Sequence, residues 1–135
     1  CIADLDGHFV RVNPEFTRVL GYSERELLTR PYLDFVHPDD VEPSVVQMKR
    51  SERGEPIHDY ENRYIAADGS IRWLSWRAIT VADEKLVYAA ARDVTAENEA
   101  NARIAKIERD LAHGGRLSST GELATSPAHG PNRPL

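Results

Sequence analysis

The sequence is poor in cysteine and contains no long hydrophobic run. Its single cysteine, Cys1, excludes an intramolecular disulfide and a metal site built from several thiolates. No apolar stretch approaches the roughly 18 residues that span a bilayer, so we expect no membrane contact in this segment. Basic residues form no stripe and the net charge is −5, which argues against a nucleic-acid partner.

The composition of the 135 residues is that of an ordinary globular protein, with 41% hydrophobic and 29% charged residues. This length suffices for one domain and an appendage. The chain begins inside a strand-like run and shows no signal peptide. We therefore expect a piece of a longer protein that resides in the reducing cytoplasm.

The pair Asp68-Gly69 lies between two runs rich in aromatic and β-branched residues. Because glycine adopts a positive φ at little steric cost, this pair predicts a β-hairpin. The second run carries Trp73 on one face and Trp76 on the other, whereas a strand covered on one side alternates more cleanly. We expect a central strand with packing on both sides.

Caps and turns predict the remaining elements of the first 95 residues. The expected elements are two short strands around Asp6-Gly7, a helix capped by Asn13, a helix with a capping box at Ser23–Glu26, a turn at 32–36, a helix from Asp39 to Arg53 and a last strand at 86–94. Helices that lie between runs of strands indicate an α+β fold with an antiparallel sheet.

The sequence changes character after Thr95. Four apolar residues recur at spacings of 4, 3 and 4, namely Ala100, Ile104, Ile107 and Leu111. This a/d pattern is typical of a two-stranded coiled coil, so we expect a signalling helix at 96–113 that forms a homodimer. The pattern fails at Gly114-Gly115, and prolines interrupt the remainder, so 114–135 is expected to be frayed.

The first 95 residues resemble a PAS sensor domain, including its C-terminal PAC motif. The matching segments, in order, are Asp4–Phe16, Leu20–Leu27, Val36–Asp40, Glu61–Tyr64, Asp68–Trp73 and Arg92–Thr95. The resemblance implies a five-stranded antiparallel sheet with helices on one face. It also implies a role as a sensor in signal transduction.

Residues 111–135 resemble the start of the dimerisation and phosphoacceptor helix of a sensor histidine kinase. His129 stands where that family carries its phosphorylated histidine, and Asn132, Pro134 and Leu135 also match. Gly130 replaces the acidic residue that usually follows, so we expect poor phosphate acceptance. In the parent protein the resemblance implies an ATP-binding kinase domain, a response regulator and a phosphorelay as partners.

The resemblance also bears on cofactors. Haem-binding relatives use a histidine on the helix before the hairpin, and flavin-binding light sensors use a cysteine in the helical segment. The helix expected at 39–53 has no histidine, and no cysteine follows Cys1. We therefore expect no haem, flavin or metal, and we expect surface or capping roles for His8, His37 and His58.

A set of core-type residues stands where a small-molecule pocket would form. These residues are Leu33, Phe35, Val36, Val45, Met48, Tyr60, Asn62, Tyr64, Trp73 and Ser75. A filled core needs the same residues, so a filled core and a pocket both remain open. Asn62 and Ser75 are the polar groups expected to face a ligand, and Trp73 is expected in the core.

Asp93 and Thr95 are the candidate signal-transfer residues, because they lie where the last strand becomes the output helix. Thr95 is expected to cap that helix, and Asp93 to pair with Arg72 or Arg77 on the neighbouring strand. The predicted function is a non-catalytic sensory and dimerisation module of a two-component histidine kinase. The alternative is a PAS protein-interaction module with a filled core, attached to another output such as a cyclic-dinucleotide enzyme.

Overall fold

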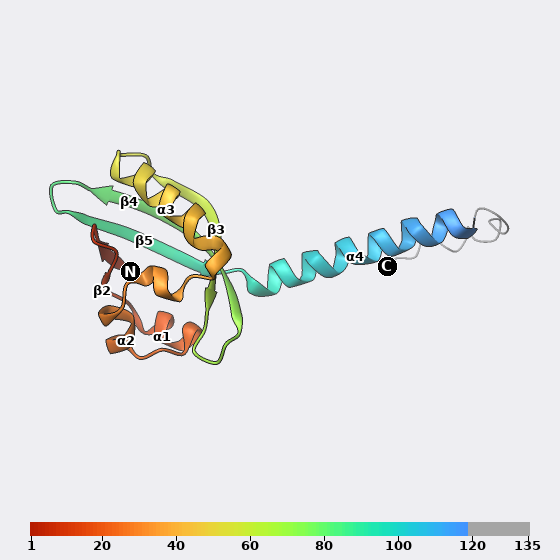
Figure 1. Cartoon of the computed structure of the whole chain (residues 1–135), viewed down its shortest axis with the longest axis horizontal. Coiled ribbons are helices and arrows are strands. Elements are labelled where there is room, and N and C mark those ends of the chain that lie inside the picture. The colour runs from red at the N-terminus through yellow and green to blue at the C-terminus, as the bar shows by residue number, and fades with distance from the viewer. Residues whose placement is uncertain (119–135) are drawn as a thin grey trace. The chain divides into compact units, whose positions relative to one another are not determined.

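The computed structural model describes the backbone of residues 1–118 and the side chains of residues 1–114. The chain divides into two compact units, Cys1–Ala96 and Glu97–Leu135. The first unit contains five strands and the first helices, whereas the second consists, in its described part, of helix alone (Figure 1).

The five strands form one antiparallel sheet in the order β2-β1-β5-β4-β3. They are β1 (Ile2–Asp4), β2 (Phe9–Arg11), β3 (Ile57–Ile65), β4 (Ile71–Val81) and β5 (Leu86–Asp93). The predicted α+β class and the five-stranded sheet are confirmed. One detail differs, because β4 is interior but the central strand is β5.

Helix α1 (Pro14–Leu20) begins and ends as the sequence predicts. The Asn13 side chain accepts a hydrogen bond from the Phe16 N–H, and Gly21 ends the helix with a φ of 78°. An added Cβ on Gly21 would lie 3.3 Å from the Cβ of Ala67, in the hairpin between β3 and β4. The glycine is therefore needed both for its left-handed backbone and for this close approach.

Helix α2 (Glu24–Thr29) carries the predicted capping box, and the 3₁₀-helix η1 (Tyr32–Phe35) follows it. Helix α3 (Pro38–Glu52) differs at its start, because its N-cap is His37 rather than Asp39 or Asp40. The His37 Nδ1 accepts a hydrogen bond from the Asp39 N–H at 3.1 Å. His37 thus has one of the two roles, surface or capping, that were expected of His8, His37 and His58.

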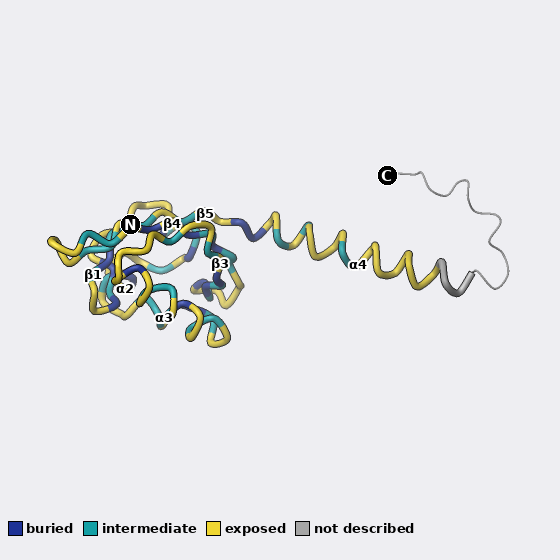
Figure 2. The backbone as a smooth tube through the Cα atoms, turned by 90° about the horizontal axis from the view of Figure 1, so that it is seen from above, coloured by how far each residue is buried: buried dark blue, intermediate teal, exposed yellow. Residues whose placement is uncertain are grey.

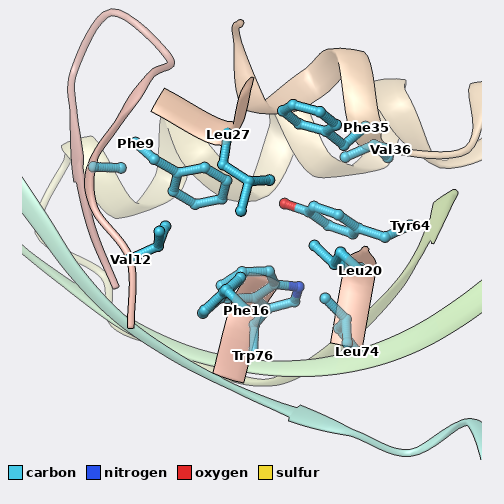
Figure 3. Close-up of a cluster of buried hydrophobic side chains, with 11 residues drawn as sticks. Phe9, Val12, Phe16, Leu20, Leu27, Phe35, Val36, Tyr64, Leu74 and Trp76 are labelled. Atoms are coloured by element: carbon cyan, nitrogen blue, oxygen red, sulfur yellow. The ribbon is translucent and has the colours of Figure 1, made fainter. Parts of the chain in front are cut away.

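The core lies on the face of the sheet that the helices cover. Figure 2 shows α2 and α3 on one side of β4 and β5, and Figure 3 shows the side chains packed between these layers. The buried cluster consists of Ala3, Phe9, Val12, Phe16, Leu20, Leu27, Phe35, Val36, Tyr64, Leu74 and Trp76. Leu27 and Phe35 are completely inaccessible to solvent.

The β3–β4 hairpin has a different register from the one that a two-residue Asp68-Gly69 turn would produce. The Ala66 N–H donates to the Ser70 carbonyl at 2.8 Å, and Gly69 has a φ of 87°, so the loop has three residues. A shift of one residue moves every side chain of a strand to the opposite face. Trp76 therefore lies in the core with 8% of its surface exposed.

Trp73 lies on the other face of β4, where it is half-buried, so its predicted core position is wrong. The guanidinium of Arg63 lies 5.3 Å from the centre of its ring. Tyr60, Asn62 and Tyr64 share one face of β3 as predicted, but their cross-strand neighbours on β4 are Trp76, Leu74 and Arg72.

Helix α4 (Thr95–Ser118) extends past the predicted end at 113, because glycines such as Gly114 and Gly115 weaken a helix without necessarily ending it. Ile104, Ile107 and Leu111 are 53%, 56% and 69% exposed along it. The predicted phosphoacceptor position, His129, lies outside the described residues.

Candidate functional site

A pocket of about 80 Å³ lies between the helix-covered face of the sheet, η1 and α3. Six of the sequence-predicted pocket residues line it: Leu33, Val36, Met48, Tyr60, Asn62 and Tyr64. These residues come from η1 and the residue after it, from α3 and from β3, and the fold brings them together around one space.

The other four predicted residues do not line this pocket. Phe35 is fully buried and packs against Tyr22, with 4.7 Å between the ring centres. Val45 lies on a neighbouring face of α3. Trp73 and Ser75 lie on the opposite face of β4, as the hairpin register requires.

Sequence reasoning missed Tyr32, Ser44 and Trp76, which line the pocket. Helix α3 turns a small polar side toward the sheet, where Ser44 and Ser51 are only 6% and 2% exposed. A signal for Ser44 exists in the sequence, because it stands four residues before Met48 and therefore on the same helical face. Trp76 could be assigned to the pocket only with the correct register of the β3–β4 hairpin.

A chain of hydrogen bonds fixes the polar side of the pocket. The Trp76 Nε1–H donates to Asn62 Oδ1 at 2.8 Å, and Asn62 Nδ2 donates to Ser44 Oγ at 3.0 Å. Ser44 Oγ also lies 3.0 Å from the Tyr60 hydroxyl, with either oxygen able to donate. Because Asn62 is 4% exposed, its amide is held by these partners rather than by solvent.

The three tyrosine hydroxyls of the pocket ionise less readily than that of a free tyrosine. Burial raises the pKa of Tyr32, of Tyr60 and of Tyr64 above the ordinary tyrosine value. No aspartate, glutamate, lysine, arginine or histidine lines the pocket. The amino group of Cys1, at its edge, donates to the Ala89 carbonyl oxygen at 2.8 Å.

The size of the pocket limits what it can hold. An apolar cavity of about 150 Å³ accommodates benzene, and drug-sized ligands occupy pockets of about 300–1,000 Å³. A volume of about 80 Å³ therefore admits only a molecule of a few heavy atoms or a few waters.

Asp93 and Thr95 join the sheet to the start of α4. Asp93 Oδ1 accepts from both the Thr95 N–H at 2.9 Å and the Thr95 hydroxyl at 2.6 Å. Thr95 Oγ1 in turn accepts from the Trp73 N–H of β4 at 2.8 Å. Of the two arginines expected to pair with Asp93, Arg72 does so, with 3.4 Å between Nη1 and Oδ2.

A second set of contacts links α3 to the same part of β4. Arg63 binds Asp40, in the first turn of α3, through Nε at 3.0 Å and Nη2 at 2.7 Å. Its backbone N–H donates to Asp40 Oδ2 at 2.7 Å. The Arg63 guanidinium holds the pKa of Asp40 below its usual range. Arg63 also stacks on Trp73, whose backbone N–H donates to Thr95 at the start of α4. Helix α3 and the start of α4 are therefore connected through Arg63 and Trp73.

Among residues 1–118 no helix is long and apolar enough to cross a membrane. The same part of the chain holds no group of three or more histidine, cysteine, aspartate or glutamate side chains arranged to bind a metal ion.

A family model described as the PAS fold matches residues 9–89. The chain is 29% identical over 144 residues to the C4-dicarboxylate transport sensor protein DctS of Rhodobacter capsulatus, covering 98% of this chain and 21% of that protein. It is 23% identical over 139 residues to the sensor histidine kinase TmoS of Ectopseudomonas mendocina, covering 99% of this chain and 14% of that protein. The chain thus spans a small fraction of either relative.

The fold also resembles solved structures. A domain of the sensory box sensor histidine kinase/response regulator from Geobacter sulfurreducens superposes with a TM-score of 0.60 at 25% identity. The match covers 68% of this chain and 79% of that one.

Proposed function

Because the chain belongs to the PAS family, we propose that residues 1–96 are the sensory module of a two-component sensor histidine kinase and that α4 passes the signal on within a homodimer. The two sensor-protein relatives support the kinase assignment, since both match almost the whole of this chain. The partners in the parent protein would be its ATP-binding domain and a response regulator. We place this module in the cytoplasm, where ATP is available.

The junction at the start of α4 is the observation that carries the proposal. Thr95 bonds to Asp93 and to the backbone of Trp73, so a change in the position of β4 reaches the first turn of α4 directly. The Asp40–Arg63–Trp73 contacts connect α3, a wall of the pocket, to the same point. A signal would be a bias between two packings of a helix pair.

The exposed apolar side of α4 supports the homodimer. Ile104, Ile107 and Leu111 share one side of the helix and are more than half exposed in a single chain. A second copy of the helix would cover them by knobs-into-holes packing. We propose that this coiled coil contributes the main contact between protomers.

A double substitution in the a/d positions of α4, here called the seam (Ala100, Ile104, Ile107 and Leu111), tests the dimer. Ile104→Asp combined with Ile107→Asp places two charges in the helix interface and should shift the chain from dimer to monomer in light scattering. The control is Ala102→Asp combined with Ala105→Asp, which adds the same charge outside the a/d positions. An unchanged dimer in the seam variant would show that α4 is not the main contact.

The small pocket favours one alternative function. A space of about 80 Å³ is close to a filled core, and a filled core suits a PAS module that binds a protein partner and serves another output, such as a cyclic-dinucleotide enzyme. We propose that no haem, flavin or metal is used in either case. Native mass spectrometry of the purified chain distinguishes the two, because a retained small molecule supports sensing.

A further inference from the structure

Two charged side chains flank the seam of α4 on opposite sides. Arg103 directly precedes Ile104, and Glu108 directly follows Ile107. Since Ile104 and Ile107 occupy an a and a d position of the heptad, Arg103 takes a g position and Glu108 an e position. These two positions border the apolar contact of a coiled coil. Any helix that covers the seam therefore also meets the charges of Arg103 and Glu108.

Neither charge has a counter-charge among the side chains that the structure describes. Arg103 and Glu108 are exposed, and no ion pair joins either of them to another residue among 1–114. They do not reach each other, because a spacing of five residues separates them by about 140° around the helix axis. An ion pair between Arg103 and Glu108 thus requires a second helix.

The seam is short, which leaves the choice of partner to the charges beside it. Toward the junction with the sheet the next a position is Glu97, and beyond Leu111 the next d position is Gly114. Neither residue extends the apolar contact. A short apolar seam fits many amphipathic helices, whereas charges at e and g positions favour only helices that carry the complementary charges.

We propose that Arg103 of one protomer pairs with Glu108 of the partner subunit, and that this pair selects a second copy of this chain as the partner. In a parallel two-stranded coiled coil, each g position lies beside the e position five residues further along the other helix. The twofold symmetry of a dimer forms the pair twice. The proposal rests on the proposed homodimer, with parallel helices so that both sensory modules act on the same end of the helix pair.

An antiparallel helix pair would combine different residues. Its g positions face each other, so Arg103 would lie near Asp110 of the partner subunit, which also occupies a g position. Glu108 would then lie near an e residue of the other helix, Asn101 of the partner subunit, and would form no ion pair there. The two orientations therefore depend on different acidic residues, Glu108 for the parallel pair and Asp110 for the antiparallel pair.

Charge reversal in the full chain tests the ion pair. Arg103→Glu and Glu108→Arg each place like charges opposite each other twice in a homodimer. Each variant should therefore raise the dimer dissociation constant about tenfold in sedimentation equilibrium. An equimolar mixture of the two variants restores both attractive pairs, so native mass spectrometry should show the mixed dimer in large excess over either homodimer. Dimers in the proportions of random pairing would overturn the proposal.

Asp110→Arg is the matched control, because it makes the same change of charge as Glu108→Arg. In the parallel pair the residue beside position 110 is Gly115 of the partner subunit, so this variant should keep the dissociation constant within about twofold of the wild type. A loss as large as that of Glu108→Arg would overturn the proposal. At about 1 M salt the effects of Arg103→Glu and Glu108→Arg should shrink, because exposed charges are screened. Effects that stay unchanged at that salt concentration would not come from charge and would also overturn it.

The failures of the two proposals are distinguishable. If the Ile104→Asp, Ile107→Asp variant is monomeric while both charge variants dimerise like the wild type, the coiled coil stands and partner selection by the ion pair fails. If the seam variant remains dimeric while the mixed dimer still predominates, the ion pair stands and α4 is not the main contact. A wild type without any dimer in sedimentation equilibrium would overturn the ion pair and leave only the sensory role of residues 1–96.

Discussion

The globular unit at residues 1–96 and helix α4 differ in how far their apolar side chains are buried. Within the globular unit Leu27 and Phe35 are completely buried by neighbouring helices and strands. On α4 Ile107 and Leu111 are 56% and 69% exposed. The first unit can therefore gain its stability from its own packing, whereas the apolar side of α4 would gain stability from the partner helix that we propose.

The sharpest test within the globular unit compares the two tryptophans of β4. Trp76→Ala should lower the free energy of unfolding by about 3–5 kcal/mol, because it removes a buried ring and leaves the Asn62 oxygen without its donor. Trp73→Ala should have a smaller effect, about 1–2 kcal/mol, because that ring is half-buried on the outer face. Urea denaturation followed by circular dichroism measures both. A larger loss for Trp73 would contradict the observed pairing of β3 with β4.

An intermediate effect is expected at the contact between α3 and β3. Asp40 and Arg63 expose 16% and 28% of their side chains, so Asp40→Asn should destabilise the globular unit by about 1–2 kcal/mol at neutral pH. Arg63 lowers the pKa of Asp40 in the folded state. Its contribution is therefore present above the unfolded carboxyl pKa of about 4 and is lost as the pH falls through the folded value.

The measurement is the urea midpoint of the wild type and of Asp40→Asn at pH 7 and at pH 3. The midpoints of the two proteins should differ most at pH 7 and less at pH 3, because the contribution of Asp40 declines as the pH falls below the unfolded pKa. Glu55→Gln is the control, because Glu55 and its partner Arg50 are both about half exposed and their pair contributes little. A difference between wild type and Asp40→Asn that is as large at pH 3 as at pH 7 would assign the effect to the amide itself.

These comparisons also show which features the sequence predicts. Signals confined to a few residues predict the structure well, as with the Asn13 cap, the Ser23–Glu26 capping box and the glycine that ends α1. Each depends on a side chain and a backbone group that are close in the sequence. The motifs that match the PAS family predict the sheet for the same reason, because each motif is local and corresponds to one strand, helix or turn.

The candidate site is harder to predict because it depends on the alignment of distant segments. The hairpin loop has one residue more than a two-residue Asp68-Gly69 turn, so Trp76 rather than Trp73 lines the pocket. Helix α3 is oriented about its axis so that Ser44, rather than Val45, faces the sheet. The register of β4 leaves no mark in the local sequence, since both faces of the strand carry a tryptophan. The spacing of Ser44 and Met48 is the one local signal for α3, which carries small polar residues where a hydrophobic face was expected.

The smallest expected effect sharpens the contrast between the two units. Ile107→Ala keeps a strong helix-forming residue and removes an exposed side chain, so unfolding of the globular unit should change by less than about 0.5 kcal/mol. Both tryptophans lie in β4, so their fluorescence reports that unit alone. In the homodimer that we propose, the same substitution should favour dissociation, because it removes a side chain from the helix–helix interface. Denaturation curves at high dilution, with sedimentation at high concentration, measure the two effects separately. A stability loss above about 1 kcal/mol at high dilution would mean that Ile107 packs within its own chain, and the division into a self-sufficient unit and a partner-dependent helix would be wrong.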